Sequence, residues 1–372
     1  MAQHWQVFAG SDGLRALTPA WEALAVRAGT SFLHHPAWYG AQLATTPASD
    51  DDTLFFARHE GDRLVAVVPA VFTAEARDDR LPLDVHFACW ELAYHSEMGL
   101  RDATVDPSLV RAELVDSLRE AFDERAPADL VRFRNLPASS RLLTAARRAP
   151  AWYTLPSHGS KYLDTSASHD ALMARYSGKY RRNLRRKLTK LESLGHSRVE
   201  LVTREPELGR AFEAFLEVES SGWKGERGTS IARQPAQRAY YEHLLAGLAR
   251  TGHALITLLW LDDRCIAGQF AVRAGRTVHL LRIGYDESLA AVSPGALLLD
   301  ALLQHACACD GVDRVSFVTG IGWMDAWKPE VEPVENVYAF GRSLKGRYLQ
   351  TAILAHGYLK ARTGPGTADT AA

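Results

Sequence analysis

The chain has 372 residues, of which 47% are hydrophobic and 23% are charged, and its formal net charge is -1 at pH 7. This composition is typical of globular proteins, and the length is enough for two packed domains. The near-zero net charge excludes a molecule whose overall field draws it to nucleic acid or to a membrane surface, so any basic site has to be local.

Neither a targeting segment nor a metal centre is expected. The first residues lack the cationic start and the apolar core of a secretory signal, and no apolar run approaches the roughly 18 residues that span a bilayer. We therefore expect a cytoplasmic protein. Cys307 and Cys309 are the one close cysteine pair, and residues two apart on a helix point in nearly opposite directions, which favours packing over metal binding.

The first half of the chain alternates between helical and strand patterns. The expected elements are a helix at 11–29, two antiparallel strands within 52–76 that turn at 60–62, a helix within 108–126 and a strand at 128–137. Residues 141–166 lose this periodicity and contain Pro150 and Pro156, which makes them the best candidate for a linker.

The same order of elements repeats in the second half. The expected elements are helices at 176–195, 206–222 and 235–252, a strand at 197–203, three strands within 253–287, a helix from Pro294 to about Cys309 and a strand at 313–320. Leu184, Leu188, Leu191 and Leu194 predict the buried stripe of the first of these helices, and Gly195 its left-handed stop. Strands on both sides of a crossover helix predict an α/β fold with a mixed (α+β) sheet. Residues 363–372 form a low-complexity tail that we expect to be disordered.

A candidate anion site lies at the start of the helix after residue 292. Ser293 suits the N-cap, Pro294 suits the first turn, and Gly295 has no side chain to block a ligand. Unpaired amides and the positive end of the helix dipole then favour a phosphate or a diphosphate. The alternative is an ordinary helix start that binds nothing.

Two other segments carry unusual charge or aromatic character. Trp223 and Lys224 lie between glycines, with Glu219 close by, and such a loop either contacts a ligand or packs its tryptophan on a sheet edge. A basic helix is formed by Arg175, Lys179, Arg181, Arg182, Arg185, Arg186, Lys187 and Lys190. Such a helix could bind the phosphates of a cofactor, an RNA backbone or an acidic partner. The alternative is a basic face that is only solvated.

The order of several motifs resembles one superfamily. The motifs are Lys179-Tyr-Arg-Arg-Asn-Leu-Arg-Arg-Lys, Gly222-Trp-Lys-Gly, Gly284-Tyr-Asp286, Ser293-Pro-Gly295 and a strand end near Gly320. Together they resemble the GNAT-superfamily proteins associated with cellulose biosynthesis, the CelD or BcsL-like acetyltransferases, which are cousins of the FemAB peptidoglycan aminoacyl transferases. The resemblance runs from Phe32 to about Lys328.

The resemblance implies two GNAT-like modules in tandem, a degenerate one at 1–155 and an acyltransferase module at 156–362. Acetyl-CoA or another acyl-CoA is then the cosubstrate, and donor and acceptor meet between the modules. The cofactor-binding candidates are Ser293, Pro294, Gly295 and Ala296, with Arg282 on the preceding strand. The substrate-binding candidates are Trp223, Asp286, Lys328 and Trp38, and no metal is implied.

The chain departs from the family pattern at two places. Ser316 stands where an acidic residue is often found, and the usual phosphate loop of the form Gln/Arg-x-x-Gly-x-Gly/Ala is absent. The general base is therefore open: Glu219 or Glu97 is the candidate, with His95 beside the latter. Tyr285 or Lys224 is the candidate donor to the oxyanion or to the leaving thiolate.

The sequence favours an N-acyltransferase that acts on an amine of a small molecule, an amino sugar or an exopolysaccharide precursor. Two alternatives stay open. The basic helix suits aminoacyl transfer from tRNA, as in the FemAB cousins, although no aromatic-interleaved basic strand offers a stacking platform. The other alternative is a non-catalytic GNAT-like module in polysaccharide production. The acceptor, the acyl chain length and the oligomeric state cannot be read from the sequence.

Overall fold

The computed structural model describes residues 4–29, 32–46, 50–78, 81–95, 97–222, 228–320 and 322–363, so the predicted tail lies outside the described residues from position 364 on. The chain divides into two compact units. The first unit is Met1–Ala28, Ala48–Gly159 and Glu332–Ala372, and the second is Gly29–Pro47 and Ser160–Val331. The functional division into modules 1–155 and 156–362 stays a prediction.

The first unit is built on a mixed sheet. Its strands are β1 (Trp5–Ala9), β2 (Thr53–Glu60), β3 (Arg63–Ala76), β4 (Phe87–Leu92), β5 (Thr104–Val105), β6 (Leu130–Pro137), β13 (Glu330–Phe340) and the first part of β7 (Trp152–Asp164). The order is β1-β2-β3-β4-β6-β13-β7, and β5 pairs with β3. Neighbours are antiparallel from β1 to β4, β4 and β6 are parallel, and β6 and β13 are antiparallel.

Helices cover both faces of this first sheet. They are α1 (Gly10–Ala28), η3 (Pro107–Leu109), α3 (Ala112–Arg125), α4 (Arg141–Ala146) and α11 (Leu344–Thr363). α3 and α4 share a core cluster with Phe56, Trp90 and Val337. α11 packs on the other face, where Leu349 meets Tyr338. The predicted hairpin turn at 60–62 is confirmed, since β2 and β3 pair up to Glu60 and Arg63.

The second unit carries the remaining strands. They are β8 (Ser197–Val202), β9 (Ala254–Leu261), β10 (Arg264–Ala274), β11 (Thr277–Tyr285), β12 (Arg314–Ser316) and the last part of β7. The order is β7-β12-β11-β10-β9-β8, in which β11 and β12 are parallel and all other neighbours are antiparallel. The prediction of three strands within 253–287 is confirmed.

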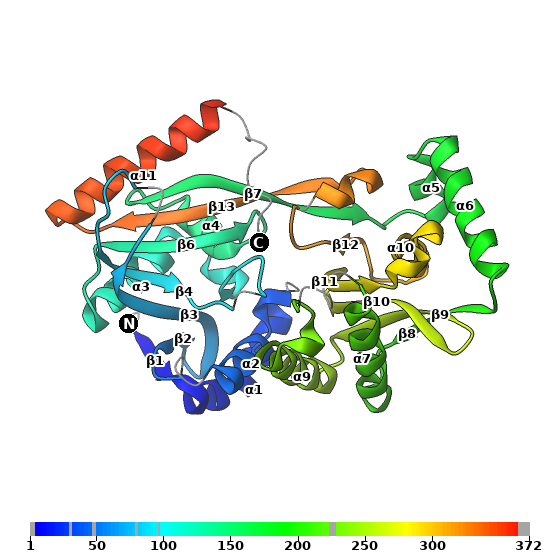
Figure 1. Cartoon of the computed structure of the whole chain (residues 1–372). Coiled ribbons are helices and arrows are strands. Elements are labelled where there is room, and N and C mark those ends of the chain that lie inside the picture. Colours follow the sequence, from blue (N-terminus) through cyan, green and yellow to red (C-terminus); the bar gives the residue numbers. More distant parts are fainter. Residues whose placement is uncertain are drawn as a thin grey trace. The chain divides into compact units, whose positions relative to one another are not determined.

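The helices of the second unit are α2 (Ala37–Thr45), α5 (His169–Ala174), α6 (Gly178–Glu192), α7 (Glu205–Ser220), α9 (Pro235–Arg250) and α10 (Pro294–Ala308). Short 3-10 helices are η1 (Phe32–His34), η4 (Ile231–Arg233), η5 (Glu287–Val292) and η6 (Gly322–Trp327). Phe270 of β10 packs against α7 and α9, whereas its neighbour Ala271 lies in the cluster with α10. In Figure 1, α7 and α9 accordingly lie below the strands and α10 above them.

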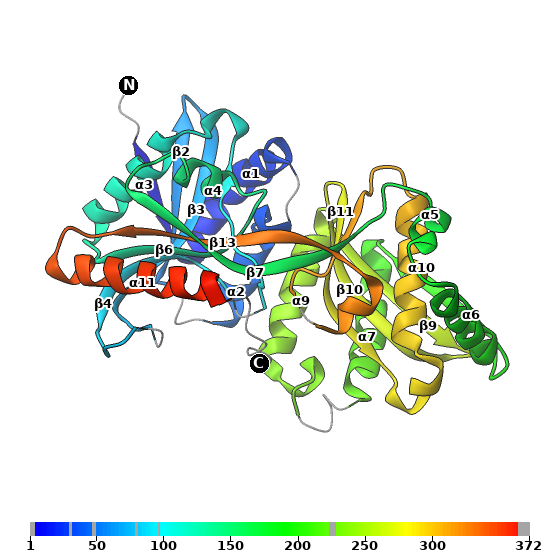
Figure 2. The ribbon, with the colours of Figure 1, turned by 90° about the horizontal axis from the view of Figure 1, so that it is seen from above.

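The two units repeat one topology. In each unit, three antiparallel strand pairs follow one another and are succeeded by a parallel pair and then by one more antiparallel strand. The chain connects the two strands of the parallel pair through a helix, which is α3 in the first unit and α10 in the second. The last strand of each unit breaks the order of the chain. β13, from the C-terminal region, pairs with β6 of the first unit, and β7, which comes before the second unit's other strands, pairs with β12 (Figures 1 and 2). The predicted fold class, a mixed α/β protein built from two modules in tandem, is confirmed by this repeated topology.

Three local predictions are wrong. Residues 141–166 are not an irregular linker but α4 and β7, whose residues complete sheets. On α6, Leu184 and Leu191 are buried but Leu188 is 42% exposed, because the helix contacts its neighbours along a narrower stripe; Leu194 lies beyond the end of α6 and is 51% exposed. Gly195 does not adopt a left-handed conformation; it allows close approach instead, since a Cβ there would lie 2.4 Å from Oδ2 of Asp262.

Candidate active site at the end of β11

The strands β11 and β12 separate soon after they begin. They pair at only three positions, from Thr277 with Arg314 to His279 with Ser316, and β11 then continues to Tyr285. In open α/β sheets, ligands bind at the carboxyl ends of strands where neighbouring strands diverge. A ligand site is therefore expected along the last residues of β11.

A β-bulge changes the direction of the β11 side chains before this end. Phe270 of β10 is opposite Arg282, whereas the next residue, Ala271, is opposite Leu280, so Leu281 is the extra residue. Bulges of this kind re-aim side chains and are frequent next to active sites. Here the bulge turns Arg282 toward α9, where its Nε donates to the hydroxyl of Tyr241 at 2.8 Å.

Two glycines allow close packing on opposite faces of this strand end. A Cβ on Gly284 would lie 2.6 Å from Cα of Glu219, so α7 can approach β11 here only over a glycine. A Cβ on Gly295 would lie 3.3 Å from Cδ1 of Tyr285, so the tyrosine ring lies against the first turn of α10. Glu219 and Tyr285 therefore flank the end of β11 from different sides.

Glu219 is buried near the end of α7 and is 3% exposed. Its Oε2 accepts a hydrogen bond from the backbone N–H of Ile231 at 2.9 Å. The carboxylate thus joins the end of α7 to η4, across the segment that contains Trp223 and Lys224. Those two predicted site residues lie outside the described residues.

The start of α10 differs from the predicted cap. Ser293 occupies the N-cap position but adopts a left-handed conformation (φ 49°, ψ 62°), and its side chain caps no amide of the helix. Its Oγ instead accepts a hydrogen bond from Nζ of Lys187 at 2.6 Å, and its carbonyl accepts from Ala296 and Leu297. The capping prediction is wrong because the hydroxyl is turned toward α6. The result is an ammonium group placed at the positive end of a helix dipole.

The basic helix α6 has no neutralising partners in the part of the chain that the structure describes. No ion pair there involves its seven cations, Lys179, Arg181, Arg182, Arg185, Arg186, Lys187 and Lys190. Nε of Arg181 is also shielded from solvent without a hydrogen-bond partner. A concentration of unpaired cations beside a helix N-terminus attracts anions.

Three other candidates are held within the protein. The carboxylate of Asp286 accepts from the N–H and hydroxyl of Ser288 at 2.9 and 2.6 Å, caps η5 and pairs with Arg264. Nζ of Lys328 donates to the carbonyl of Arg175 at 3.4 Å, and this lysine is exposed. Trp38 is buried, and its Nε1 donates to the carbonyl of Phe32 at 2.8 Å.

The candidates His95 and Glu97 belong to the first compact unit, whereas the end of β11 belongs to the second. Both residues are half-buried, and the N–H of Glu97 donates to Nδ1 of His95 at 3.3 Å. Among the residues placed by the structure, no three His, Cys, Asp or Glu side chains gather closely enough to hold a metal ion. No helix among them is long and apolar enough to cross a membrane.

The sequence interpretation missed two buried histidines of the second unit. His279 lies under the ring of Phe32, with centroids 4.2 Å apart, and neither ring nitrogen has a hydrogen-bond partner. Burial lowers its pKa to about 3. His35 also has a pKa lowered to about 3, by burial and then by His253 and Arg250, and its Nε2 lies 2.9 Å from Oγ1 of Thr251. Strand alternation on β11 could have marked His279 as buried.

One protein family model matches the part of the chain that contains this site. Residues 178–328 match the family model described as an acetyltransferase (GNAT) domain. No curated protein matches the sequence. The more specific resemblance to CelD or BcsL-like proteins stays a prediction.

Solved structures share the fold over nearly the whole chain. FemX is 12% identical, with 93% of this chain and 99% of that chain covered and a TM-score of 0.58. L-PGS from Bacillus licheniformis is 13% identical, with coverages of 94% and 98% and a TM-score of 0.52. The chain therefore has the fold of these solved structures, and its residues 178–328, which include β11 and the start of α10, match the model of a GNAT acetyltransferase domain.

Proposed function

We propose that the chain transfers an acyl group from acyl-CoA to an amine of a small molecule, an amino sugar or an exopolysaccharide precursor. Catalysis is assigned to the module at 156–362, and the module at 1–155 is a degenerate copy. The observation that carries the proposal is the start of α10, which follows β11 and η5 and where Nζ of Lys187 lies 2.6 Å from Oγ of Ser293. An ammonium group and a helix N-terminus together suit a diphosphate.

The residues at this helix start fit the diphosphate of CoA. Pro294 has no N–H to lose, Gly295 presents no side chain, and Lys187 supplies a positive charge. Ser293 and Ala296 complete the turn that would hold the phosphates. Arg282 is directed toward Tyr241, so we assign it a role in holding β11 and α9 together beside the cofactor rather than on the phosphates.

The chemistry requires a neutral amine, a donor to the oxyanion and a proton for the leaving thiolate. We assign the proton acceptor to Glu219, acting through water, because its Cα, Cβ and Cγ lie against Gly284 at the end of β11, which places this residue beside the strand end. We assign the proton donor to Tyr285, which is 39% exposed and lies against the first turn of α10. The sequence offers alternatives for both roles: Glu97 with His95 for the proton acceptor, and Lys224 for the donor. The residues proposed to bind or shape the acceptor side are Trp223, Lys328, Asp286 and Trp38.

A thermal-shift series with acyl-CoAs of graded chain length tests this function. A ligand at 100 times its Kd that binds only the native state stabilises it by about 2.7 kcal/mol. That corresponds to a rise in Tm of roughly 5–10 °C for a unit of this size. Lys187→Gln should reduce the rise, whereas Lys190→Gln, an exposed cation farther along α6, should not. No shift with any acyl-CoA, or equal shifts in both variants, would contradict the proposal.

One observation favours a second function, aminoacyl transfer from tRNA. The seven cations of α6 lack ion-pair partners where the structure describes their surroundings, and an RNA backbone could neutralise them. Binding to bulk tRNA would then weaken steeply between low and physiological salt, while acyl-CoA would leave Tm unchanged. If neither ligand binds, the third alternative holds: a non-catalytic GNAT-like module in polysaccharide production.

A further inference from the structure

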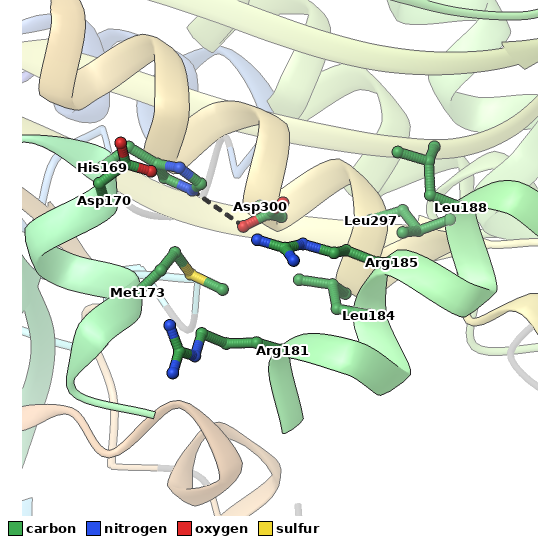
Figure 3. A pocket seen from close by; sticks show the side chains of 9 residues that line it. All are labelled: His169, Asp170, Met173, Arg181, Leu184, Arg185, Leu188, Leu297 and Asp300. Atoms are coloured by element: carbon green, nitrogen blue, oxygen red, sulfur yellow. Dashed lines mark hydrogen bonds and ion pairs between the residues drawn. The ribbon is translucent and has the colours of Figure 1, made fainter. Parts of the chain in front are cut away.

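A small cavity of about 120 Å³ lies between α5, α6 and α10 (Figure 3). Met173, Leu184 and Leu297 give it an apolar wall, and Leu184 and Leu297 are each 7% exposed. Charged side chains line the rest of the cavity. An apolar wall with a few converging polar groups is the usual composition of a small-molecule site.

The cations of this cavity are available to a ligand. Arg181 and Arg185 extend from α6 toward α5 in Figure 3, and no ion pair involves either of them within the described part of the chain. Nε of Arg181 is inaccessible to solvent and unpartnered. Such a buried donor costs free energy unless a bound group accepts from it.

The acids of the cavity are Asp170 and Asp300. Oδ1 of Asp300 lies 3.0 Å from Nε2 of His169, which engages that carboxylate, and burial raises the pKa of Asp300. Asp170 lies in the first turn of α5. The carboxylate of Asp300, which the two arginines of α6 face, is therefore already paired with His169. The guanidinium groups keep their hydrogen-bond donors for a ligand.

The cavity is close to the proposed diphosphate site along the same helix. Leu297 and Asp300 follow Ser293 by four and seven residues, and at a rise of 1.5 Å per residue they lie about 6 and 10 Å along the axis. Lys187, which bonds Ser293, comes from the same helix as the two arginines. One ligand could therefore occupy both the start of α10 and the cavity. It would carry a diphosphate for the first, and a planar, weakly polar group with a further phosphate for the second.

We propose that this cavity binds the 3′-phosphoadenosine end of acyl-CoA, with Arg181 and Arg185 on the 3′-phosphate and the apolar wall against the adenine. The inference rests on the proposed function, because it continues the ligand whose diphosphate lies at the start of α10. It assigns the chain a preference for CoA thioesters over thioesters that lack the 3′-phosphate.

The test compares acetyl-CoA with acetyl-3′-dephospho-CoA by calorimetry on three proteins: the wild type, Arg181→Gln/Arg185→Gln, and Arg182→Gln/Arg186→Gln as the matched control on the other side of α6. Charge-assisted hydrogen bonds from two guanidinium groups predict that the wild type binds acetyl-CoA about 10-fold or more tightly than the dephospho form. The first double variant should lose this preference, and the control variant should keep it.

The outcomes separate the two proposals. Tight but equal binding of both ligands by the wild type overturns the cavity assignment and leaves the proposed function standing. A preference that survives in Arg181→Gln/Arg185→Gln does the same. Failure of the wild type to bind either ligand overturns both. If the double variant does not fold, Arg185→Gln alone, at an exposed position, should reduce the preference, and an unchanged preference there overturns the assignment.

Discussion

Glu219 allows a structural role to be separated from a chemical one. Glu219→Ala removes the acceptor of the buried N–H of Ile231, whose loss costs about 1–3 kcal/mol. Glu219→Gln keeps an oxygen that can accept this bond but removes the charge, so its cost should be about 1 kcal/mol. For a unit of about 190 residues, a loss of 2 kcal/mol lowers Tm by roughly 4–8 °C.

Activity should follow the opposite pattern. If Glu219 is the base, Glu219→Gln lowers turnover by about 10²–10⁴ although its stability is nearly that of the wild type. Urea denaturation and thiol release from acetyl-CoA with a panel of amines measure the two quantities. Glu217→Gln, an exposed position two residues earlier on α7, is the control for both. Wild-type turnover in Glu219→Gln would refute the base assignment, and full stability in Glu219→Ala would refute the role of the bond to Ile231.

Three further predictions concern stability. His35 and His279 have pKa values of about 3 in the folded state, against 6.5 in the unfolded state, so the unfolded state binds more protons on acidification. Stability is complete well above pH 6.5 and falls below it, with a slope that approaches about 1.4 kcal/mol per pH unit for each histidine. The loss in urea-measured stability between pH 6.5 and 5.5 should therefore be about 1 kcal/mol smaller in His279→Phe, and an unchanged loss would show that His279 takes up protons when folded. Gly284→Ala should destabilise by about 1–3 kcal/mol, because its Cβ would lie 2.6 Å from Cα of Glu219; a Tm equal to that of the wild type would contradict this packing. A fragment of residues 1–155 should show no cooperative thermal transition by circular dichroism, because it lacks β13 and α11, and a sharp transition would mean that the first unit forms without them.

The elements that the sequence predicted well are those with strong local patterns. The three strands of 253–287 alternate and are separated by turn residues, and the helix from Pro294 has a proline in its first turn. The irregular composition of 141–166 was misleading. β7 lies in the middle of the strand order, where pairing on both sides outweighs weak local propensity.

The candidate site was predicted in part. The sequence could propose Ser293 and Gly295 because helix starts have local signals, whereas it marked Lys187 only as one of many cations. Its bond to Ser293 joins residues 106 positions apart, which no local pattern reports. Asp286 and Trp38 were predicted from residue type alone, and the sequence did not show that their polar atoms have hydrogen-bond partners within the protein.

The exchange of β7 and β13 bears on the order in which the protein forms during synthesis. β6 finds its antiparallel neighbour only when residues near 335 have left the ribosome, about 200 positions later. Until then the edge of β6 stays open, as do the apolar surfaces that Val337 and Tyr338 contact on opposite faces of the sheet, which favours association with other nascent chains. The first unit is thus the earlier to be translated and the later to be completed, and a holding chaperone would act on it rather than on the second unit.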